Sequence, residues 1–224
     1  MPEVNTEENI NQFFAFISSL EYPEVILDFF DEIVEEGFPL ETFLVKQILD
    51  EMGLLPDKYN LYKGYLEVVK KYFTLNCNII EVGGGYYPRL AKIISKEQSR
   101  GSITVYDPNL VINKLSGIKL IKDNFSYDTD IRSCDLLLAL APCEATKIAI
   151  EKANKESKEY CVALCGCSHF GTEELREHNS ISNSWCQEMW NLAKETAPKD
   201  NEVMIDYMAE YYDYPYAIIL SKKR

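Results

Sequence analysis

No part of this sequence approaches the roughly 20 consecutive apolar residues that a membrane-spanning helix needs. The first residues are acidic and lack the basic stretch of a secretory signal, so we expect no such signal. The chain also lacks a Cys-x-x-Cys pair, and its seven cysteines are an odd number. Unpaired thiols are typical of a reducing compartment, so these absences together predict a cytoplasmic protein without a membrane segment.

Positive charge is also scarce, because 23 Lys and Arg side chains face 36 Asp and Glu side chains, a net charge of −13. The deficit is concentrated in residues 1–74, which have 5 basic and 15 acidic side chains, whereas residues 75–224 have 18 and 21. An acidic surface repels phosphate backbones, so we expect no nucleic-acid partner. A small molecule or a basic protein suits this charge better, although acids that only keep a surface soluble would give the same composition.

Residues 1–74 contain helical patterns only. Apolar residues recur at helical spacing in four stretches, which lie near residues 5–20, 23–37, 39–53 and 57–73. Short amphipathic helices need a partner surface for their apolar faces. We therefore predict that residues 1–74 form a helical N-terminal cap on the domain that follows.

From residue 75 onward, short apolar strands alternate with helices. Mostly apolar strands such as Cys77–Val82 and Cys134–Ala141 are typical of a parallel sheet covered on both faces. Two closing strands, Val203–Tyr212 and Tyr216–Lys222, have so short a link that they must pair antiparallel. Residues 75–224 are therefore predicted to form an α/β domain with a Rossmann-like, mostly parallel seven-stranded sheet that ends in an antiparallel hairpin. The remaining expected strands are Ser102–Tyr106, Lys119–Lys122 and Tyr160–Cys165.

A glycine cluster lies where the first of these strands gives way to a helix. Glu81 stands near the end of the strand, and Gly83, Gly84 and Gly85 follow it. Glycine has no Cβ atom, so the backbone can turn sharply there and approach a ligand. Such a loop at the first strand–helix crossover is typical of nucleotide-type cofactor sites, in which a carboxylate such as Asp107, at the end of the second strand, accepts hydrogen bonds from ribose hydroxyls.

These features resemble the class I S-adenosylmethionine-dependent methyltransferases, whose seven-stranded sheet ends in a similar hairpin. The resemblance covers about residues 75–224, and its best motif is Glu81-x-Gly83-x-Gly85. Family proteins usually have a third glycine two residues further on, where this chain has Tyr87. The resemblance implies that Glu81 faces the ammonium group of S-adenosylmethionine, directly or through water, and that the loop binds the cofactor through Gly83, Gly84, Gly85 and Tyr87.

The ends of the later strands complete the site that the resemblance implies. Asp107 would bind the ribose, and Asp123 and Asn124, after the third strand, would lie near the adenine. Ala141, at the end of the fourth strand, would lie where the cofactor and the methyl acceptor meet. The leading hypothesis is therefore an S-adenosylmethionine-dependent methyltransferase that acts on an unidentified small molecule, with no catalytic residue assigned.

Other interpretations stay open. A nicotinamide site prefers Gly-x-Gly-x-x-Gly. This chain has Pro88 in place of the last glycine, and its bulk counts against a nicotinamide cofactor. Families that methylate exocyclic amines place Asn or Asp before Pro-Pro, whereas this chain has Leu140-Ala141-Pro142-Cys143. This difference counts against a methylase that acts on DNA or RNA bases. The missing third glycine and the absence of an acid–base group favour a second hypothesis, in which the fold serves as a non-catalytic binding or scaffold protein. A homodimer is compatible with either hypothesis.

Two further patterns carry separate hypotheses. Cys165-x-Cys167-x-His169 follows the fifth strand, and in an extended segment the three side chains would point one way and could bind zinc. No fourth ligand is evident, so ordinary thiols and a loop imidazole are the simpler interpretation, and His169 as a general base beside the acceptor is another. Glu144 is expected at the N-terminus of the helix after the fourth strand, where a negative charge is favourable.

Overall fold

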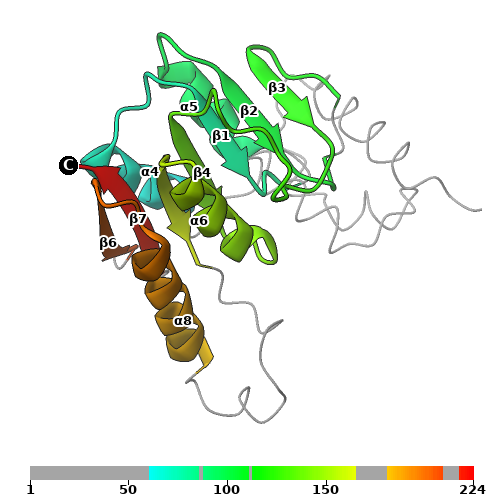
Figure 1. The fold of residues 1–224 in the computed structure, drawn as a ribbon. Helices are drawn as coiled ribbons and strands as arrows, with labels where there is room; N and C mark the ends of the chain where they lie inside the picture. Colours follow the sequence, from blue (N-terminus) through cyan, green and yellow to red (C-terminus); the bar gives the residue numbers. More distant parts are fainter. Residues whose placement is uncertain (1–60, 86–87, 111–112, 165–180, 209–216) are drawn as a thin grey trace, which may run out of the picture.

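One seven-stranded sheet organises the computed structural model, which describes residues 61–85, 88–110, 113–164, 181–208 and 217–224. The strand order is β3-β2-β1-β4-β5-β7-β6 (Figure 1). Strands β1 to β5 pair in parallel, whereas β7 is antiparallel to both β5 and β6. This confirms the predicted Rossmann-like sheet with a C-terminal antiparallel hairpin. The strands are β1 (Ile79–Val82), β2 (Ile103–Tyr106), β3 (Ile118–Ile121), β4 (Leu136–Leu140), β5 (Glu159–Ala163), β6 (Asn201–Tyr207) and β7 (Ala217–Lys223).

Helices cover both faces of this sheet, which explains the mostly apolar character of its central strands. One face packs against α4 (Leu61–Tyr72) and α5 (Arg89–Glu97), and the other against α6 (Ala145–Lys155) and α8 (Ile181–Thr196). Successive strand residues point to opposite faces, so both need apolar side chains. Ile79, Leu138, Cys161 and Ile218 belong to the first core, and Ile80, Leu137, Val162 and Ile219 to the second.

Helix α4 is an integral part of the first core. Tyr65 and Val69 are fully buried against the sheet. The Tyr65 hydroxyl accepts a hydrogen bond from the Ala139 N–H (3.2 Å) and donates one to the Cys161 carbonyl (2.6 Å). This hydroxyl therefore ties α4 to two neighbouring strands. The division of the chain at residue 74 stays a prediction, and three of the four expected cap helices fall in residues 1–60, outside the described residues.

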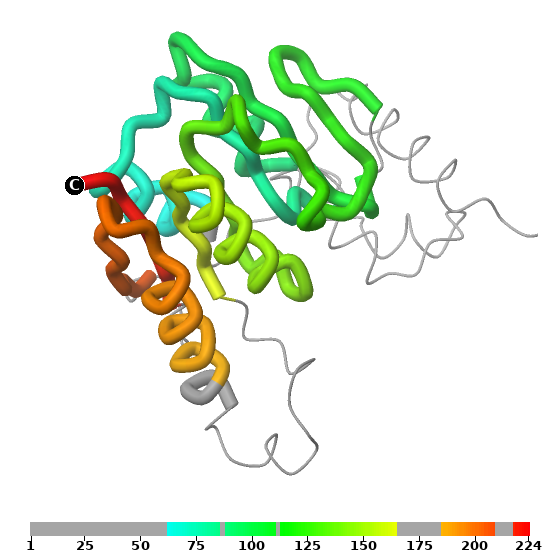
Figure 2. The backbone as a smooth tube through the Cα atoms, viewed as in Figure 1, coloured from blue at the N-terminus to red at the C-terminus, as the bar shows by residue number. Residues whose placement is uncertain are grey.

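The two ends of the described chain lie side by side, as the tube in Figure 2 shows for α4 and the β6–β7 hairpin. Asp206 on β6 accepts hydrogen bonds from Lys71 Nζ (2.9 Å) and from the Tyr72 hydroxyl (2.8 Å) on α4. The hairpin is thus fixed to the layer that begins the described structure. The predicted link 213–215 and the residues 209–212 of the first hairpin strand lie outside the described residues.

Some strand boundaries differ from the expectation. β1 begins at Ile79 and β4 at Leu136, later than the predicted starts at Cys77 and Cys134. At this end of the pair, the Asn78 N–H donates to the Asp135 carboxylate (2.9 Å) instead of a backbone carbonyl, so the regular ladder has not yet begun. The Cys134 N–H bonds within a turn, to the Ile131 carbonyl (2.9 Å). Cys77 and Cys134 continue the apolar pattern of the strands that they precede, so the sequence predicted both strands to begin too early.

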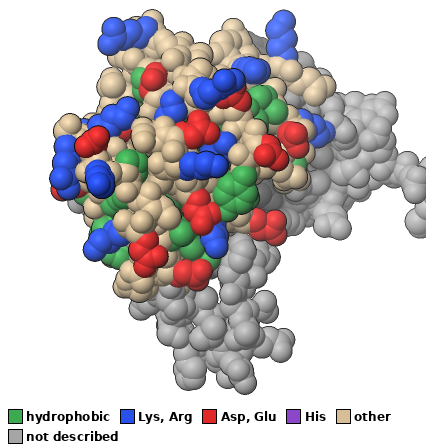
Figure 3. All heavy atoms as spheres, viewed as in Figure 1, with side chains coloured by type: hydrophobic (Ala, Val, Ile, Leu, Met, Phe, Trp, Pro, Cys, Tyr) green, Lys and Arg blue, Asp and Glu red, His purple; other side chains and the backbone are tan. Residues whose placement is uncertain are grey.

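The surface shown in Figure 3 carries Lys and Arg side chains interspersed with Asp and Glu side chains. On this face, the described residues form no continuous basic surface of the kind that binds nucleic acid. Within the described ranges, no helix combines the length and the apolar content that crossing a membrane would require.

Candidate functional site

The carboxyl edge of the sheet contains a topological switch point between β1 and β4. From β1 the chain crosses to β2 and β3 on one side, and then returns to β4 and β5 on the other side. Open sheets of this type bind ligands in the crevice beyond the carboxyl ends of the strands at such a point. The strand ends that meet there carry the glycine loop after β1, Asp107 after β2 and Ala141 after β4.

The glycine loop turns as the sequence predicts. Gly83 (φ +80°) and Gly85 (φ +68°) have left-handed backbone conformations, which residues with a Cβ atom rarely adopt. A Cβ atom on Gly83 would lie 3.1 Å from both Cα and Cβ of Pro142, and one on Gly84 would clash with Cγ1 of Val105. The protein's own packing therefore already requires two of the three glycines, independently of any ligand.

Asp107 joins the loop after β1 to the end of β2. Its Oδ2 accepts a hydrogen bond from the Gly85 N–H (2.9 Å), and its Oδ1 accepts one from the Asn109 N–H (2.7 Å). The residue is 7% exposed, and burial raises the pKa of this carboxyl, while the two N–H groups and a hydrogen bond from the Asn109 side chain partly offset that effect. A carboxylate has about four acceptor positions, so this one keeps capacity for a further donor.

Glu81 is buried in the middle of β1, with 3% of its surface exposed. Its Oε2 accepts a hydrogen bond from the Ala91 N–H (2.9 Å), in the first turn of α5. A carboxylate at a helix N-terminus is favourable because the first N–H groups of a helix have no partner within it. Glu81 thus has a clear role in the fold, and its contact with a cofactor ammonium stays a prediction.

The backbone at the end of β4 is strained. Ala141 (φ +52°) and Cys143 (φ +48°) both lie in the left-handed region, on either side of Pro142. Such conformations cost free energy in non-glycine residues and cluster at functional sites. The Ala141 N–H donates to the Ala163 carbonyl (3.0 Å), which fixes this turn to the end of β5. Sequence reasoning missed the strain, because the residue before a proline normally favours an extended backbone.

The segment after β3 presents Asp123 and Asn124 at the surface. Both side chains are exposed, and Oδ1 of Asp123 accepts a hydrogen bond from the Asn124 N–H (2.7 Å). Phe125, the next residue, is buried and packs edge-on against the Tyr106 ring at the end of β2, with 5.7 Å between ring centroids. This anchor holds the segment next to the strand that carries Asp107.

Other predicted positions contribute less to the described site. Tyr87, Cys165, Cys167 and His169 lie outside the described residues, and within the described part of the chain no three potential metal ligands gather. Glu144 does stand at the N-terminus of α6, but its exposed side chain makes no capping hydrogen bond.

Comparison with known proteins adds the fold family. No known family model matches the sequence, and no curated protein matches it. Among solved structures, fibrillarin from Aeropyrum pernix, with natively bound S-adenosylmethionine, is similar with a TM-score of 0.50 and 13% identity over 73% of this chain and 76% of that chain. A proposed S-adenosylmethionine-dependent methyltransferase from Methanococcus maripaludis has a TM-score of 0.50 and 16% identity over 75% and 88% of the two chains.

A proposed rRNA methylase from Clostridium thermocellum is similar to the same degree, with a TM-score of 0.50 and 15% identity over 75% of this chain and 98% of that chain. At these identities the likeness concerns the fold. The fold is that of the class I S-adenosylmethionine-dependent methyltransferases, and no subfamily stands out.

Proposed function

We propose that this chain binds S-adenosylmethionine at the carboxyl edge of its sheet and transfers the methyl group to a small molecule. One observation carries this proposal: the glycine loop, Asp107 and the strained turn at Ala141 meet across the topological switch point. The hydrogen bond from the Gly85 N–H to Asp107 links two of these elements directly. All three lie where sheets of this type bind nucleotide cofactors.

The residues present fit this cofactor. Asp107 retains acceptor capacity for a hydroxyl proton of a ribose. Asp123 and Asn124 are exposed at the end of β3, where they would reach the adenine amino group. When bound, S-adenosylmethionine supplies a methyl group that its sulfonium activates for transfer. The chain then contributes mainly orientation, which alone lowers the barrier of a reaction between bound partners.

The acceptor is best sought among small molecules. The rRNA methylase described above is named for an RNA substrate, but a net charge of −13 disfavours a phosphate backbone here. The free thiols of Cys134 and Cys161 fit a reducing compartment such as the cytoplasm.

The first described helix, α4, begins close to the site. Arg89, the first residue of α5 after the glycine loop, stacks over the ring of Tyr62 at the start of α4, with 4.9 Å between its guanidinium carbon and the ring centroid. The start of α4 therefore lies at the carboxyl edge. This position supports the proposal that residues 1–60 contribute a helical cap on the substrate side.

A non-catalytic scaffold is the second candidate, and one observation favours it. Both oxygens of Asp107 and one oxygen of Glu81 already bind backbone N–H groups, so these acids have structural roles without any ligand. Such contacts would persist in a protein that kept the fold and lost the activity.

Calorimetric titration with S-adenosylmethionine and S-adenosylhomocysteine separates the two candidates. We expect the wild type to bind both, and Asp107→Ala to weaken binding by about 10- to 100-fold, because each hydrogen bond to a charged group contributes about 1.5–3 kcal/mol. Asp200→Ala is the matched control, since Asp200 is exposed and precedes β6 at the opposite edge of the sheet. No binding by the wild type at about 1 mM ligand would favour the scaffold. Unchanged affinity in Asp107→Ala would remove the ribose assignment.

A further inference from the structure

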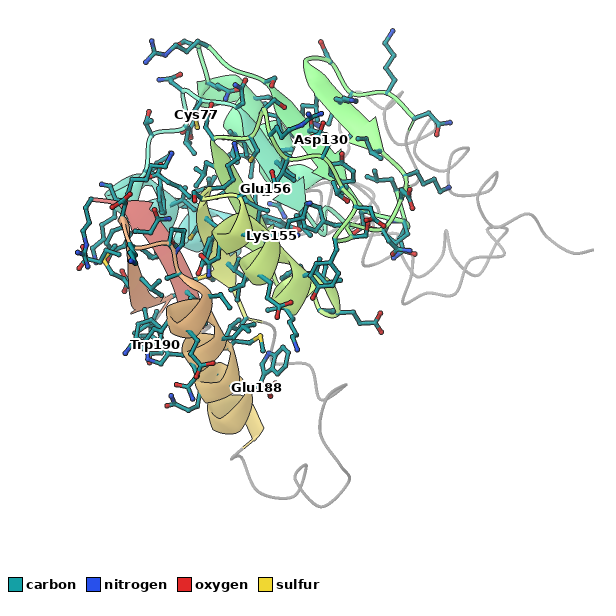
Figure 4. All side chains as sticks on the ribbon, in the orientation of Figure 1. Cys77, Asp130, Lys155, Glu156, Glu188 and Trp190 are labelled. Carbon is teal, nitrogen blue, oxygen red and sulfur yellow. The ribbon has the colours of Figure 1, made fainter. Side chains whose placement is uncertain are left out.

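Helix α6 contains a buried lysine that the proposed chemistry does not use. Lys152 is 7% exposed, although a buried ammonium group is costly unless polar partners surround it. Its Nζ donates hydrogen bonds to the Tyr127 carbonyl (2.7 Å) and to Oε1 of Glu156 (3.1 Å). Glu156 lies one turn further along at the end of α6, where Figure 4 labels it beside Lys155. The ammonium thus connects α6 to the segment that follows β3.

That segment is fixed to α6 at a second point. The Tyr127 hydroxyl donates a hydrogen bond to Glu151, the neighbour of Lys152 in the helix. The segment also closes on itself, since the Ser126 N–H donates to the Thr129 hydroxyl (2.9 Å) and the Thr129 N–H to the Ser126 carbonyl (3.1 Å). Residues 126–129 therefore form a tight turn that both the main chain and the side chain of Tyr127 attach to α6.

The expected adenine residues lie immediately before this turn. Asp123 and Asn124 are joined to it by Phe125, which is buried and packs against Tyr106. The Phe125 ring fixes the segment to β2, and the turn fixes it to α6. The chain is thus attached to the sheet and to α6 directly after Asp123 and Asn124.

We propose that Lys152 is a positioning residue for nucleoside recognition. Its ammonium holds the Tyr127 carbonyl and thereby keeps Asp123 and Asn124 where they meet the amino group of a bound adenine. This inference rests on the proposed function. Lys152 also lies in the last turn of α6, where any cation interacts favourably with the helix dipole. Lys155 occupies the same turn and is exposed. Its substitution therefore measures the dipole effect alone, without the clamp, by which we mean the contact of Lys152 with the Tyr127 carbonyl.

The test compares Lys152→Met, which keeps the apolar stem, with Lys152→Arg, which keeps the charge, and with Lys155→Met as the control. Each protein is titrated with S-adenosylhomocysteine and with S-inosylhomocysteine, in which a carbonyl oxygen replaces the adenine amino group. A general loss of stability affects both ligands alike, whereas a displaced segment lowers the preference for adenine. We expect this preference to fall about tenfold in Lys152→Met, the effect of one lost hydrogen bond to a charged group, and to recover largely in Lys152→Arg.

Amide hydrogen exchange in the free proteins provides the second readout. Residues 123–130 should exchange faster in Lys152→Met than in the wild type or in Lys155→Met, because local opening becomes easier without the clamp. If the wild type prefers adenine and Lys152→Met keeps the same preference, this inference alone is overturned. If the wild type binds neither nucleoside, the proposed function fails and the inference fails with it. Should Lys152→Met not fold, Lys152→Gln replaces it in the same comparison.

Discussion

Gly83 and Gly117 allow the steric demand of the glycine loop to be measured within one chain. Both have left-handed backbones, with φ of +80° and +74°. A Cβ atom on Gly117 would meet nothing within 4 Å, whereas one on Gly83 would lie 3.1 Å from two atoms of Pro142. Gly117→Ala therefore reports the backbone penalty alone, and Gly83→Ala reports the same penalty together with a close contact.

The expected magnitudes follow from these two effects. The left-handed conformation costs about 1–2 kcal/mol for a residue with a Cβ atom, which is the full loss expected for Gly117→Ala. Overpacking costs a further 1–3 kcal/mol or so, giving about 2–5 kcal/mol for Gly83→Ala. Pro142 cannot easily move away, because the contact involves its main chain and it lies between the strained residues Ala141 and Cys143.

Equilibrium unfolding in urea, followed by circular dichroism, measures both losses. The difference between the two variants should be about 1–3 kcal/mol, with an unchanged dependence on urea concentration. Equal losses for Gly83→Ala and Gly117→Ala would refute the close approach of Gly83 to the end of β4. A Gly83→Ala protein as stable as the wild type would refute the backbone geometry as well.

Three further outcomes are expected. Tyr65→Phe should lower the free energy of unfolding by about 1–3 kcal/mol in urea titrations, because a buried N–H and a buried carbonyl lose their hydroxyl partner. A loss under about 0.5 kcal/mol would contradict the role of this hydroxyl in joining α4 to the sheet. Burial raises the folded-state pKa of Asp107 above its ordinary value of 3.8. The protonated carboxyl therefore stabilises the fold fully below pH 3.8, and this stabilisation is lost as pH rises through the raised pKa. Asp107→Asn should remove this loss from the pH profile of stability, and an unaltered profile would argue against the raised pKa. Burial also raises the pKa of Cys134 to about 12. Iodoacetamide at pH 8 should therefore label this thiol far more slowly in native than in unfolded protein, as measured by mass spectrometry of the peptide that contains it. Equal labelling rates would contradict the burial of Cys134.

Much of the sheet could be predicted from the sequence because its pattern is local. Mostly apolar runs such as Ile79–Val82 and Leu136–Leu140 indicate burial on both faces, and a short link between two strands predicts a hairpin. The role of α4 could not be predicted in the same way. Its helical spacing shows an apolar face, but the partner of Tyr65 is Cys161, 96 residues away, and periodicity does not identify such a partner.

In the candidate site, too, the features that depend on local sequence were predictable and the others were not. The glycine loop and Asp107 were predictable because each stands at the end of a recognisable strand, and the hydrogen bond between Gly85 and Asp107 confirms that they meet. The left-handed backbone of Ala141 has no sequence signal. Lys152 sits in an ordinary helical sequence, and its burial depends on a turn that packs over it from elsewhere in the chain.

A structure of the protein crystallised with saturating S-adenosylhomocysteine tests the central claim most directly. We expect the nucleoside at the carboxyl ends of β1, β2 and β4, with its ribose hydroxyls on the Asp107 carboxylate and its adenine beside Asp123 and Asn124. An empty crevice at that concentration, or a nucleoside bound away from the glycine loop, would contradict the proposed cofactor site.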